Sequence, residues 1–340
     1  MPAGTHMTMK DVARLAGVSV STVSAFITGT VTVSSRTAGR VRKAMEALDY
    51  QPDDVARSLR TGQTHVFGVV IPDITNPFFP EVLRGIEDAA SADGYSVVFC
   101  NSNEDPVQEE RQLNGLLSRR VDGLLISCCD RSTGYERLLR RHTPIMFFDQ
   151  LPHGLEVAGV TTDNIGAAYE ATRLLIQLGH LRIAVMARQL NISPQAERVE
   201  GFRKAMQEAG LPIREEYFRA GPGGEEAGYR NTIELFGLPS PPTAIFCCNN
   251  RMLLGLARAL GDAPAACPDQ VSIIGFDDPA WTRAFQPRLT VVAQRAYEIG
   301  VLATKNLIES VASGAKASPG VIRLPAELRI RNSTSRIVSI

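Results

Sequence analysis

The chain has 340 residues, of which 44% are hydrophobic and 21% charged, so it has an ordinary globular composition and more length than one ordinary domain needs. No apolar run approaches the ~18 residues that a membrane span requires, and residues 1–10 contain no apolar segment like that of a signal peptide. We therefore expect a cytoplasmic protein with no membrane partner.

Charge is distributed unevenly along the chain although the formal net charge is zero. Residues 1–62 contain eight Lys and Arg against five Asp and Glu, whereas the remainder contains 28 basic against 31 acidic residues. A basic N-terminal segment on an acidic body favours an anionic partner for the N-terminal segment.

The six cysteines form no C-x-x-C pair, and the vicinal pairs 128–129 and 247–248 have the wrong spacing for a zinc site. We interpret all six as free thiols of small hydrophobic character, mostly buried, and expect neither a metal nor a cofactor. These cysteines are Cys100, Cys128, Cys129, Cys247, Cys248 and Cys267.

The first predicted helix begins at a capping box, in which Thr8 is followed three residues later by Asp11. The apolar side chains expected on one face of this helix are Val12, Leu15 and Ala16. Gly17 ends the helix, because glycine adopts the left-handed turn that other residues resist. Ser19 is a suitable N-cap for a second helix over 20–27. Two short helices joined by a tight turn form the helix-turn-helix pattern.

A third helix is predicted from 34 or 35 to 48 by apolar residues at helical spacing, which completes a three-helix core. The exposed face of the second helix is small and polar, with Ser21, Thr22 and Ser24. Such a helix can enter a major groove, where hydroxyls and helix N-termini reach phosphates and base edges. The alternative is the solvated surface of a helical bundle.

Residues 8–24, T-M-K-D-V-A-R-L-A-G-V-S-V-S-T-V-S, resemble the headpiece of the lac repressor/galactose repressor family. Residues 50–60, Y-Q-P-D-D-V-A-R-S-L-R, resemble that family's hinge helix. The resemblance implies a bacterial, nucleoid-associated transcriptional regulator. It implies a homodimer that reads a palindromic operator in double-stranded DNA, with repression as the expected output.

The resemblance also assigns DNA contacts to individual positions. Base-reading side chains fall at Val20, Ser21 and Ala25. Contacts to phosphates, or the support of such contacts, fall at Thr8, Ser19, Thr22, Ser34 and Thr37. In the hinge, Leu59 falls where the family's leucine wedges into the minor groove and kinks the duplex, and Arg57 belongs to the same DNA-binding segment.

The recognition helix departs from the family at Ala25, where an arginine is usual, and at Thr28, where an asparagine is usual. A bidentate contact from arginine to guanine discriminates by roughly 1–3 kcal/mol. Ala25 cannot make this contact and offers only a methyl surface. We therefore expect an operator that differs from the family's common half-site at that base pair.

From residue 66 onward, apolar runs alternate with helical patterns. The runs predicted as strands are 66–71, 95–99, 123–127, 145–148, 183–186, 244–248 and 271–276. The segments predicted as helices are 79–91, 106–119, 196–209, 251–260 and 298–310. This alternation predicts an α/β body of two doubly wound parallel sheets, with helices on both faces of each sheet.

Several landmarks in the body resemble the periplasmic-binding-protein-like core of the same family, among them P-D-I-T-N-P-F-F at 72–79 and G-F-D-D at 275–278. The implied protein is an all-α helix-turn-helix headpiece followed by a two-lobed α/β core. The implied divisions are a disordered lead-in at 1–7, a headpiece at 8–50, a hinge helix and linker at 51–63, and an effector-binding and dimerisation domain at 64–340. Its N-lobe comprises 64–163 and 294–323, and its C-lobe comprises 164–293 and 324–340.

The ends of the predicted strands supply a candidate site for a small-molecule effector, such as a sugar, in the cleft between the lobes. The resemblance places the apolar lining at Phe78 and Phe79. It places the polar contacts at Asp149, Asp163, Arg198, Asn249, Asn250, Asp277 and Gln294. Alternative roles are plain core for Phe79 and loop capping for Asp149 and Asp163.

Two departures leave the effector's identity open. Asn250 stands where the family commonly has aspartate, and Gly223 stands in a loop where sugar- and purine-binding members offer a stacking ring. A regulator that has lost its effector is one alternative, and a transport-type binding protein, which would lack the headpiece, is another. The sequence has no phosphate-cradling loop, H-E-x-x-H or nucleophile elbow, so we do not expect an enzyme.

Overall fold

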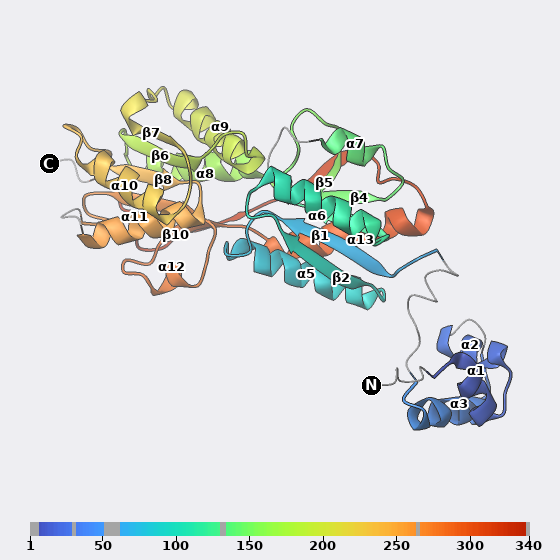
Figure 1. The fold of residues 1–340 in the computed structure, drawn as a ribbon. Helices are drawn as coiled ribbons and strands as arrows, with labels where there is room; N and C mark the ends of the chain where they lie inside the picture. Colours follow the sequence, from blue (N-terminus) through green and yellow to red (C-terminus); the bar gives the residue numbers. More distant parts are fainter. Residues whose placement is uncertain (1–6, 29–31, 51–61, 130–133, 263–265, 338–340) are drawn as a thin grey trace, which may run out of the picture. The chain divides into compact units, whose positions relative to one another are not determined.

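The computed structural model describes residues 7–28, 32–50, 62–129, 134–262 and 266–337. The chain divides into two compact units, Met1–Thr64 and His65–Ile340, each of which has a hydrophobic core of its own (Figure 1). No helix within the described ranges is long and apolar enough to cross a membrane.

The N-terminal unit contains three helices, α1 (Met9–Ala16), α2 (Val20–Thr28) and α3 (Ser35–Ala47). The Asp11 carboxylate accepts hydrogen bonds from the Thr8 backbone N–H at 3.0 Å and from the Thr8 hydroxyl at 2.6 Å. Gly17 has a φ of +62°, which allows the tight turn, and the Ser19 hydroxyl accepts from the backbone N–H of Thr22 at 3.1 Å. The helix-turn-helix prediction is therefore confirmed down to its caps.

One expectation for this unit is wrong, because Leu15 is 56% exposed instead of packing with Val12 and Ala16. The buried stripe of α1 is Met9, Val12, Ala13 and Ala16, which is the i, i+3, i+4, i+7 pattern. Leu15 lies outside that stripe. The small Ala13 takes the place beside the other two helices.

The first lobe of the second unit is built on a six-stranded parallel sheet with the order β11-β5-β4-β3-β1-β2. Its strands are β1 (Val66–Ile71), β2 (Ser96–Asn101), β3 (Gly123–Ile126), β4 (Ile145–Phe148), β5 (Ala158–Thr162) and β11 (Gly320–Leu324). Helices α5 (Phe78–Ala92) and α13 (Ala296–Ser313) share one core with the sheet. Helices α6 (Pro106–Ser118) and α7 (Tyr135–Leu139) share the other.

The second lobe is built on a sheet with the order β12-β10-β9-β8-β6-β7. Its strands are β6 (Ile183–Arg188), β7 (Phe218–Gly221), β8 (Ala244–Cys247), β9 (Ser272–Phe276), β10 (Thr290–Ala293) and β12 (Glu327–Arg329). Its helices are α8 (Asn164–Gln177), α9 (Ser193–Glu208), α10 (Glu225–Phe236), α11 (Asn250–Asp262) and the short α12 (Trp281–Ala284). Two separate cores lie in this lobe, with α8 and α9 in one and α10 and α11 in the other.

Both sheets are thus covered by helices on two faces, as the strand–helix alternation predicted (Figure 1). The second sheet departs from an all-parallel arrangement, because the edge strand β12 runs antiparallel to β10. The chain passes between the two sheets after β5, after β10 and again between β11 and β12. All six cysteines are free thiols. Four are buried, whereas Cys100 and Cys267 are half-buried.

Candidate functional site

The N-terminus of α2 presents a cluster of hydroxyl groups on the surface of the first unit. The Ser19 hydroxyl lies 2.7 Å from the Ser21 hydroxyl and 2.7 Å from the Thr22 hydroxyl. Val20 beside them is an apolar side chain that is 42% exposed. An exposed helix start with small hydroxyls and one exposed aliphatic side chain can contact both phosphates and base edges.

The other two helices of this unit also begin at predicted DNA-contact residues. Thr8 is the N-cap of α1, and Ser34 is the N-cap of α3, where its hydroxyl accepts from the Thr37 backbone N–H at 3.3 Å. Helix N-termini carry unsatisfied N–H groups and the positive end of the helix dipole, so they attract phosphate oxygens. Ala25 is half-buried on α2. The predicted hinge contacts Arg57 and Leu59 lie outside the described residues.

In the second unit, polar side chains gather at the carboxyl ends of the parallel strands of both lobes. In each sheet the chain reverses its winding direction next to the first strand, between β1 and β3 and between β6 and β8. Loops at such a switch point diverge and leave a crevice for a ligand. Phe78 follows β1, Asp149 follows β4, Asn249 follows β8, Asp277 follows β9 and Gln294 follows β10.

A cavity of about 30 Å³ lies at this point, enough for roughly one or two water molecules. The predicted effector residues that line it are Phe78, Phe79, Asp149, Arg198, Asn249, Asp277 and Gln294. Phe79 also belongs to the core of the first lobe, which was the alternative role predicted for it. A second cavity of about 380 Å³ shares Phe78, Asp277 and Gln294 with the first and adds Asn250.

Arg198 of α9 occupies the centre of the polar wall and is only 3% exposed. Its Nε donates to Asn164 Oδ1 at 2.8 Å, and its Nη1 donates to the Cys248 carbonyl oxygen at 2.7 Å. The guanidinium carbon lies 3.5 Å from the centroid of the Phe276 ring. Burial lowers the pKa of Arg198, while the nearby carboxylates of Asp277 and Asp149 favour its charged form.

The Asp277 carboxylate is held by two amide side chains. Asn250 Nδ2 donates to Oδ2 at 2.7 Å, and Gln294 Nε2 donates to Oδ1 at 2.5 Å. Gln294 Oε1 in turn accepts from the Thr162 hydroxyl at 2.6 Å, which ties this network to the first lobe. Burial raises the pKa of Asp277 although Arg198 and the two amides favour the carboxylate form. An aspartate at position 250 would repel Asp277, so Asn250 fits this network better than the family's usual residue.

Asp149 is the second buried carboxyl group of the cavity, at 6% exposure, and has a φ of +55°. Burial raises the pKa of Asp149 to about 7, with help from the charges of Asp277 and Glu197 and against that of Arg198. An unfolded aspartate titrates near pH 4, so the folded state binds this proton more tightly than the unfolded chain does. The free energy of unfolding should therefore increase as the pH falls through 7.

We expect the contribution of Asp149 to the free energy of unfolding to grow by about 1 kcal/mol between pH 8 and pH 6. Urea unfolding of the wild type and of Asp149→Asn at both pH values measures it, because the variant lacks this titration. A difference between the two proteins that does not change with pH would contradict the raised pKa.

Two predicted effector residues have structural roles that sequence spacing alone could not decide. Asp163 is the N-cap of α8, where its carboxylate accepts from the Gly166 backbone N–H at 3.0 Å, and it lines neither cavity. The observed contacts of Asp163 therefore match the capping role that was its alternative prediction. Asn249 lines the cavity but also caps α11, with Oδ1 accepting from the backbone N–H groups of Arg251 and Met252 at 3.1 Å each.

Sequence reasoning missed several polar residues that line the cavity, namely Asn76, Gln150, Arg188 and Gln195. Gln195 is buried and bridges strand ends, accepting from the Arg188 backbone N–H at 3.0 Å and donating to the Cys248 carbonyl oxygen at 3.3 Å. Gln150 in the loop after β4, Asn76 in the loop after β1 and Arg188 at the end of β6 lie where a switch-point ligand would be expected, which is the signal that could have identified them. Gln195 lies in the first turn of α9, the helix that follows β6.

Comparisons with known proteins cover both units. Residues 8–53 match the sequence profile of bacterial regulatory proteins, lacI family, and residues 64–332 match that of periplasmic binding proteins and sugar binding domain of LacI family. The ribose operon repressor of Escherichia coli (strain K12) is 37% identical over 89% of this chain and 93% of its own. The HTH-type transcriptional repressor PurR of Histophilus somni is 34% identical over 97% of this chain and 99% of its own.

Among solved structures, the lac repressor dimer bound to operator and the anti-inducer ONPF superposes with a TM-score of 0.87 at 25% identity, covering 97% of this chain and all of the other. These relatives carry the names of repressors and not of enzymes. Within the described residues, no group of three or more His, Cys, Asp or Glu side chains is arranged to hold a metal ion.

Proposed function

Since this chain belongs to the LacI family of bacterial regulatory proteins, we propose that it is a cytoplasmic transcriptional repressor whose affinity for a palindromic operator is set by a small molecule in the cleft. One observation carries the proposal. A helix-turn-helix with three capped helix starts and a two-lobed body with a polar interlobe cavity occur in one chain. Two coupled sites in one protein are what an effector-controlled repressor requires.

For the effector we propose a small, neutral, polyhydroxylated molecule such as a monosaccharide. The cavity of about 30 Å³ is too small for a monosaccharide in this conformation, so the lobes must separate to admit it. The two arginines that line the cavity already have acidic partners, so neither is left to bind a phosphate. Arg188 pairs with Glu104, and Arg198 lies beside Asp277 and Asp149. The carboxyl groups of Asp277 and Asp149 can accept from hydroxyls, and Asn249 and Gln294 supply amides. Phe78 and Phe79 are the aromatic side chains of the described cavity wall, and Gly223 offers no ring on the opposite side.

Isothermal titration of the purified protein with D-ribose, other free pentoses and hexoses, ribose 5-phosphate and hypoxanthine tests this choice. The relative named as a ribose operon repressor makes D-ribose the first sugar to try. We expect binding of one free sugar and none of the phosphate ester or the purine. Tighter binding of hypoxanthine than of any sugar would contradict the proposed effector class.

For the operator contacts we propose Val20, Ser21 and Ala25 as base readers, with hydroxyls at the three helix starts on phosphates. Replacing Ala25 with arginine should give a bidentate guanine contact and a preference of about 1–3 kcal/mol for guanine at one position of each half-site. Selection of sites from a random DNA pool by wild type and variant measures this. The same consensus from both proteins would show that position 25 does not face a base.

We propose that the protein acts as a homodimer joined through the outer edge of the first sheet. β2 is an edge strand, Phe99 on it is 55% exposed, and Val107 at the start of α6, the helix that follows β2, is 67% exposed. An unpaired strand edge with apolar side chains favours association with a second copy. The two-fold symmetry of a dimer also matches a palindrome.

Replacing Phe99 with lysine should weaken this dimer more than about tenfold, because exposed aromatic residues often dominate interfaces. Analytical ultracentrifugation over a range of concentrations measures the dissociation constant. Leu181→Lys, at an apolar side chain of the second lobe that is 64% exposed, is the matched control. Equal dissociation constants for the two variants would place the interface elsewhere.

A further inference from the structure

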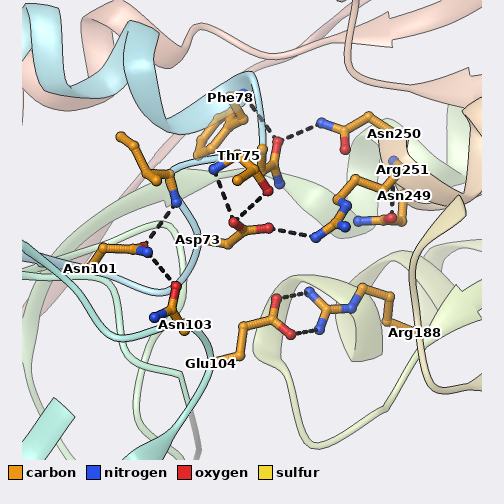
Figure 2. Close-up of polar contacts among 12 residues, drawn as sticks. Asp73, Thr75, Phe78, Asn101, Asn103, Glu104, Arg188, Asn249, Asn250 and Arg251 are labelled. Atoms are coloured by element: carbon orange, nitrogen blue, oxygen red, sulfur yellow. Dashed lines mark hydrogen bonds and ion pairs between the residues drawn. The ribbon is translucent and has the colours of Figure 1, made fainter. Parts of the chain in front are cut away.

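Acidic side chains of the first lobe meet arginines of the second lobe across the mouth of the cleft (Figure 2). Arg251 Nη1 donates to Asp73 Oδ2 at 2.7 Å. Arg188 binds Glu104 with both terminal nitrogens, and its Nη1 lies 2.7 Å from Oε1. Both acids lie on loops of the first lobe, and both arginines lie at or just beyond strand ends of the second lobe. In both of these pairs the acid belongs to the first lobe and the arginine to the second, whereas the pair Arg323–Glu197 joins the lobes in the opposite sense.

The acidic loops are shaped by hydrogen bonds of their own. Asp73 Oδ1 accepts from the backbone N–H of Thr75 at 2.9 Å and from its hydroxyl at 2.6 Å, which leaves Oδ2 directed at Arg251 (Figure 2). Asn101 Oδ1 accepts from the Ile74 backbone N–H at 2.9 Å and so joins the two loops. Because these hydrogen bonds lie within the first lobe and order its loops, the ion pairs lose less conformational entropy when they form.

Gly223 makes room for the arginine of the second pair. A Cβ at this position would lie 2.5 Å from Arg188 Cγ and Nε, so any side chain there would push Arg188 away. Gly223 stands where sugar- and purine-binding members of the family offer a stacking ring. In this chain the Arg188 side chain occupies the space beside Gly223 and reaches Glu104. The Arg188 side chain is 14% exposed and the Glu104 side chain 36% exposed, so this pair is only partly screened by water.

A third contact links the closed lobes to the effector site. Asn250 Nδ2 donates both to Asn76 Oδ1 of the first lobe at 2.8 Å and to Asp277 Oδ2 of the second at 2.7 Å. The Asn250 Oδ1 atom is buried and has no hydrogen-bond partner. One amide therefore bridges the lobes while it holds a carboxylate of the cavity wall.

We propose that Asp73–Arg251, Glu104–Arg188 and Asn76–Asn250 form a clasp that holds the two lobes in the closed arrangement, so that a molecule can enter the cleft only when the clasp opens. The clasp goes beyond the proposed function, because it concerns the contact between the lobes and does not depend on which molecule binds. Since one closure forms all three contacts, loss of one pair must loosen the others.

Hydrogen–deuterium exchange of the full-length, effector-free protein tests the clasp. Asp73→Asn should raise exchange not only near residues 73–76 but also at residues 188–195, which contain none of its partners. Glu104→Gln, whose partner Arg188 lies in that segment, should instead raise exchange at residues 250–251, which contain none of the side-chain partners of Glu104. An increase of roughly twofold to fivefold is expected from the usual strength of partly exposed ion pairs. Glu226→Gln, which breaks the exposed Glu226–Arg258 pair within the second lobe, is the matched control and should leave residues 188–195 unchanged.

The double variant Glu104→Arg with Arg188→Glu exchanges the two charges. It tests whether an ion pair at these positions is sufficient, whichever side carries the acid. Exchange rates that return toward the wild type support the clasp. An Asp73→Asn effect confined to its own loop, or an exchanged pair no slower than Glu104→Gln alone, would overturn it. These exchange measurements use no sugar, so failure of the clasp can be distinguished from failure of the proposed effector in the sugar titration.

Discussion

Replacement of Arg198 by methionine is expected to abolish effector binding and to lower the free energy of unfolding of the body by about 3–5 kcal/mol. Methionine keeps much of the length of the side chain but removes a cation that lies next to both buried carboxyl groups, Asp149 and Asp277. It also leaves the Cys248 carbonyl oxygen and Asn164 Oδ1 without the donor that Arg198 supplies. A buried charge whose partner is removed is among the costliest changes a protein can suffer.

Urea unfolding measures the stability loss, and titration with the sugar that the wild type binds measures the functional loss. Arg203→Met is the matched control, because Arg203 lies on the same helix and is exposed. We expect the control to lose less than about 0.5 kcal/mol. An Arg198→Met protein that is as stable as the control and still binds the sugar would refute the central place of Arg198.

Replacement of Leu59 by alanine is expected to lower operator affinity by about tenfold to a hundredfold, which corresponds to roughly 1.4–2.8 kcal/mol. The reason is the minor-groove wedge that the family resemblance assigns to this hinge position, since a smaller side chain cannot hold the base step apart. Affinity for the effector in the absence of DNA should not change, because the cavity residues belong to the other unit.

Fluorescence anisotropy with a labelled operator at fixed salt measures this change. Leu181→Ala, a leucine substitution at an exposed position of the body, is the control and should bind operator like the wild type. Operator affinity of Leu59→Ala within twofold of the control would exclude the wedge.

Local sequence signals predicted the helix caps and most strands well, because these features depend on neighbouring residues. The Thr8–Asp11 and Ser19–Thr22 contacts involve residues three apart, so spacing alone reveals them. The strands β1 and β4 are fully or mostly buried apolar runs and were predicted to the residue. Five strands, β5, β7, β10, β11 and β12, were not predicted. β11 and β12 are largely exposed and lack a buried apolar run, whereas β5 and β10 are buried but too short for their spacing to identify them as strands.

The exposure of Leu15 and the choice between the capping and effector-binding roles of Asp163 depend on tertiary structure, which local sequence patterns do not determine. Helical spacing alone is compatible with either Ala13 or Leu15 lying beside Val12 and Ala16 on the apolar face of α1. In the structure Ala13 packs against the other helices and Leu15 is exposed. The contacts between Glu104 and Arg188 and between Asp73 and Arg251 join residues 84 and 178 positions apart. No local sequence pattern identifies such pairs. They form because the two sheets place loops that are distant in the sequence next to each other.

Effector-controlled repression is tested most directly by selection of DNA sites from a random pool, using the full-length protein at a fixed salt concentration with and without the sugar that it binds. We expect a two-fold symmetric consensus with a flexible central step, and an affinity for that site that the sugar changes. Pools without a symmetric consensus under both conditions would contradict a sequence-specific repressor. A consensus whose affinity no sugar alters would contradict effector control.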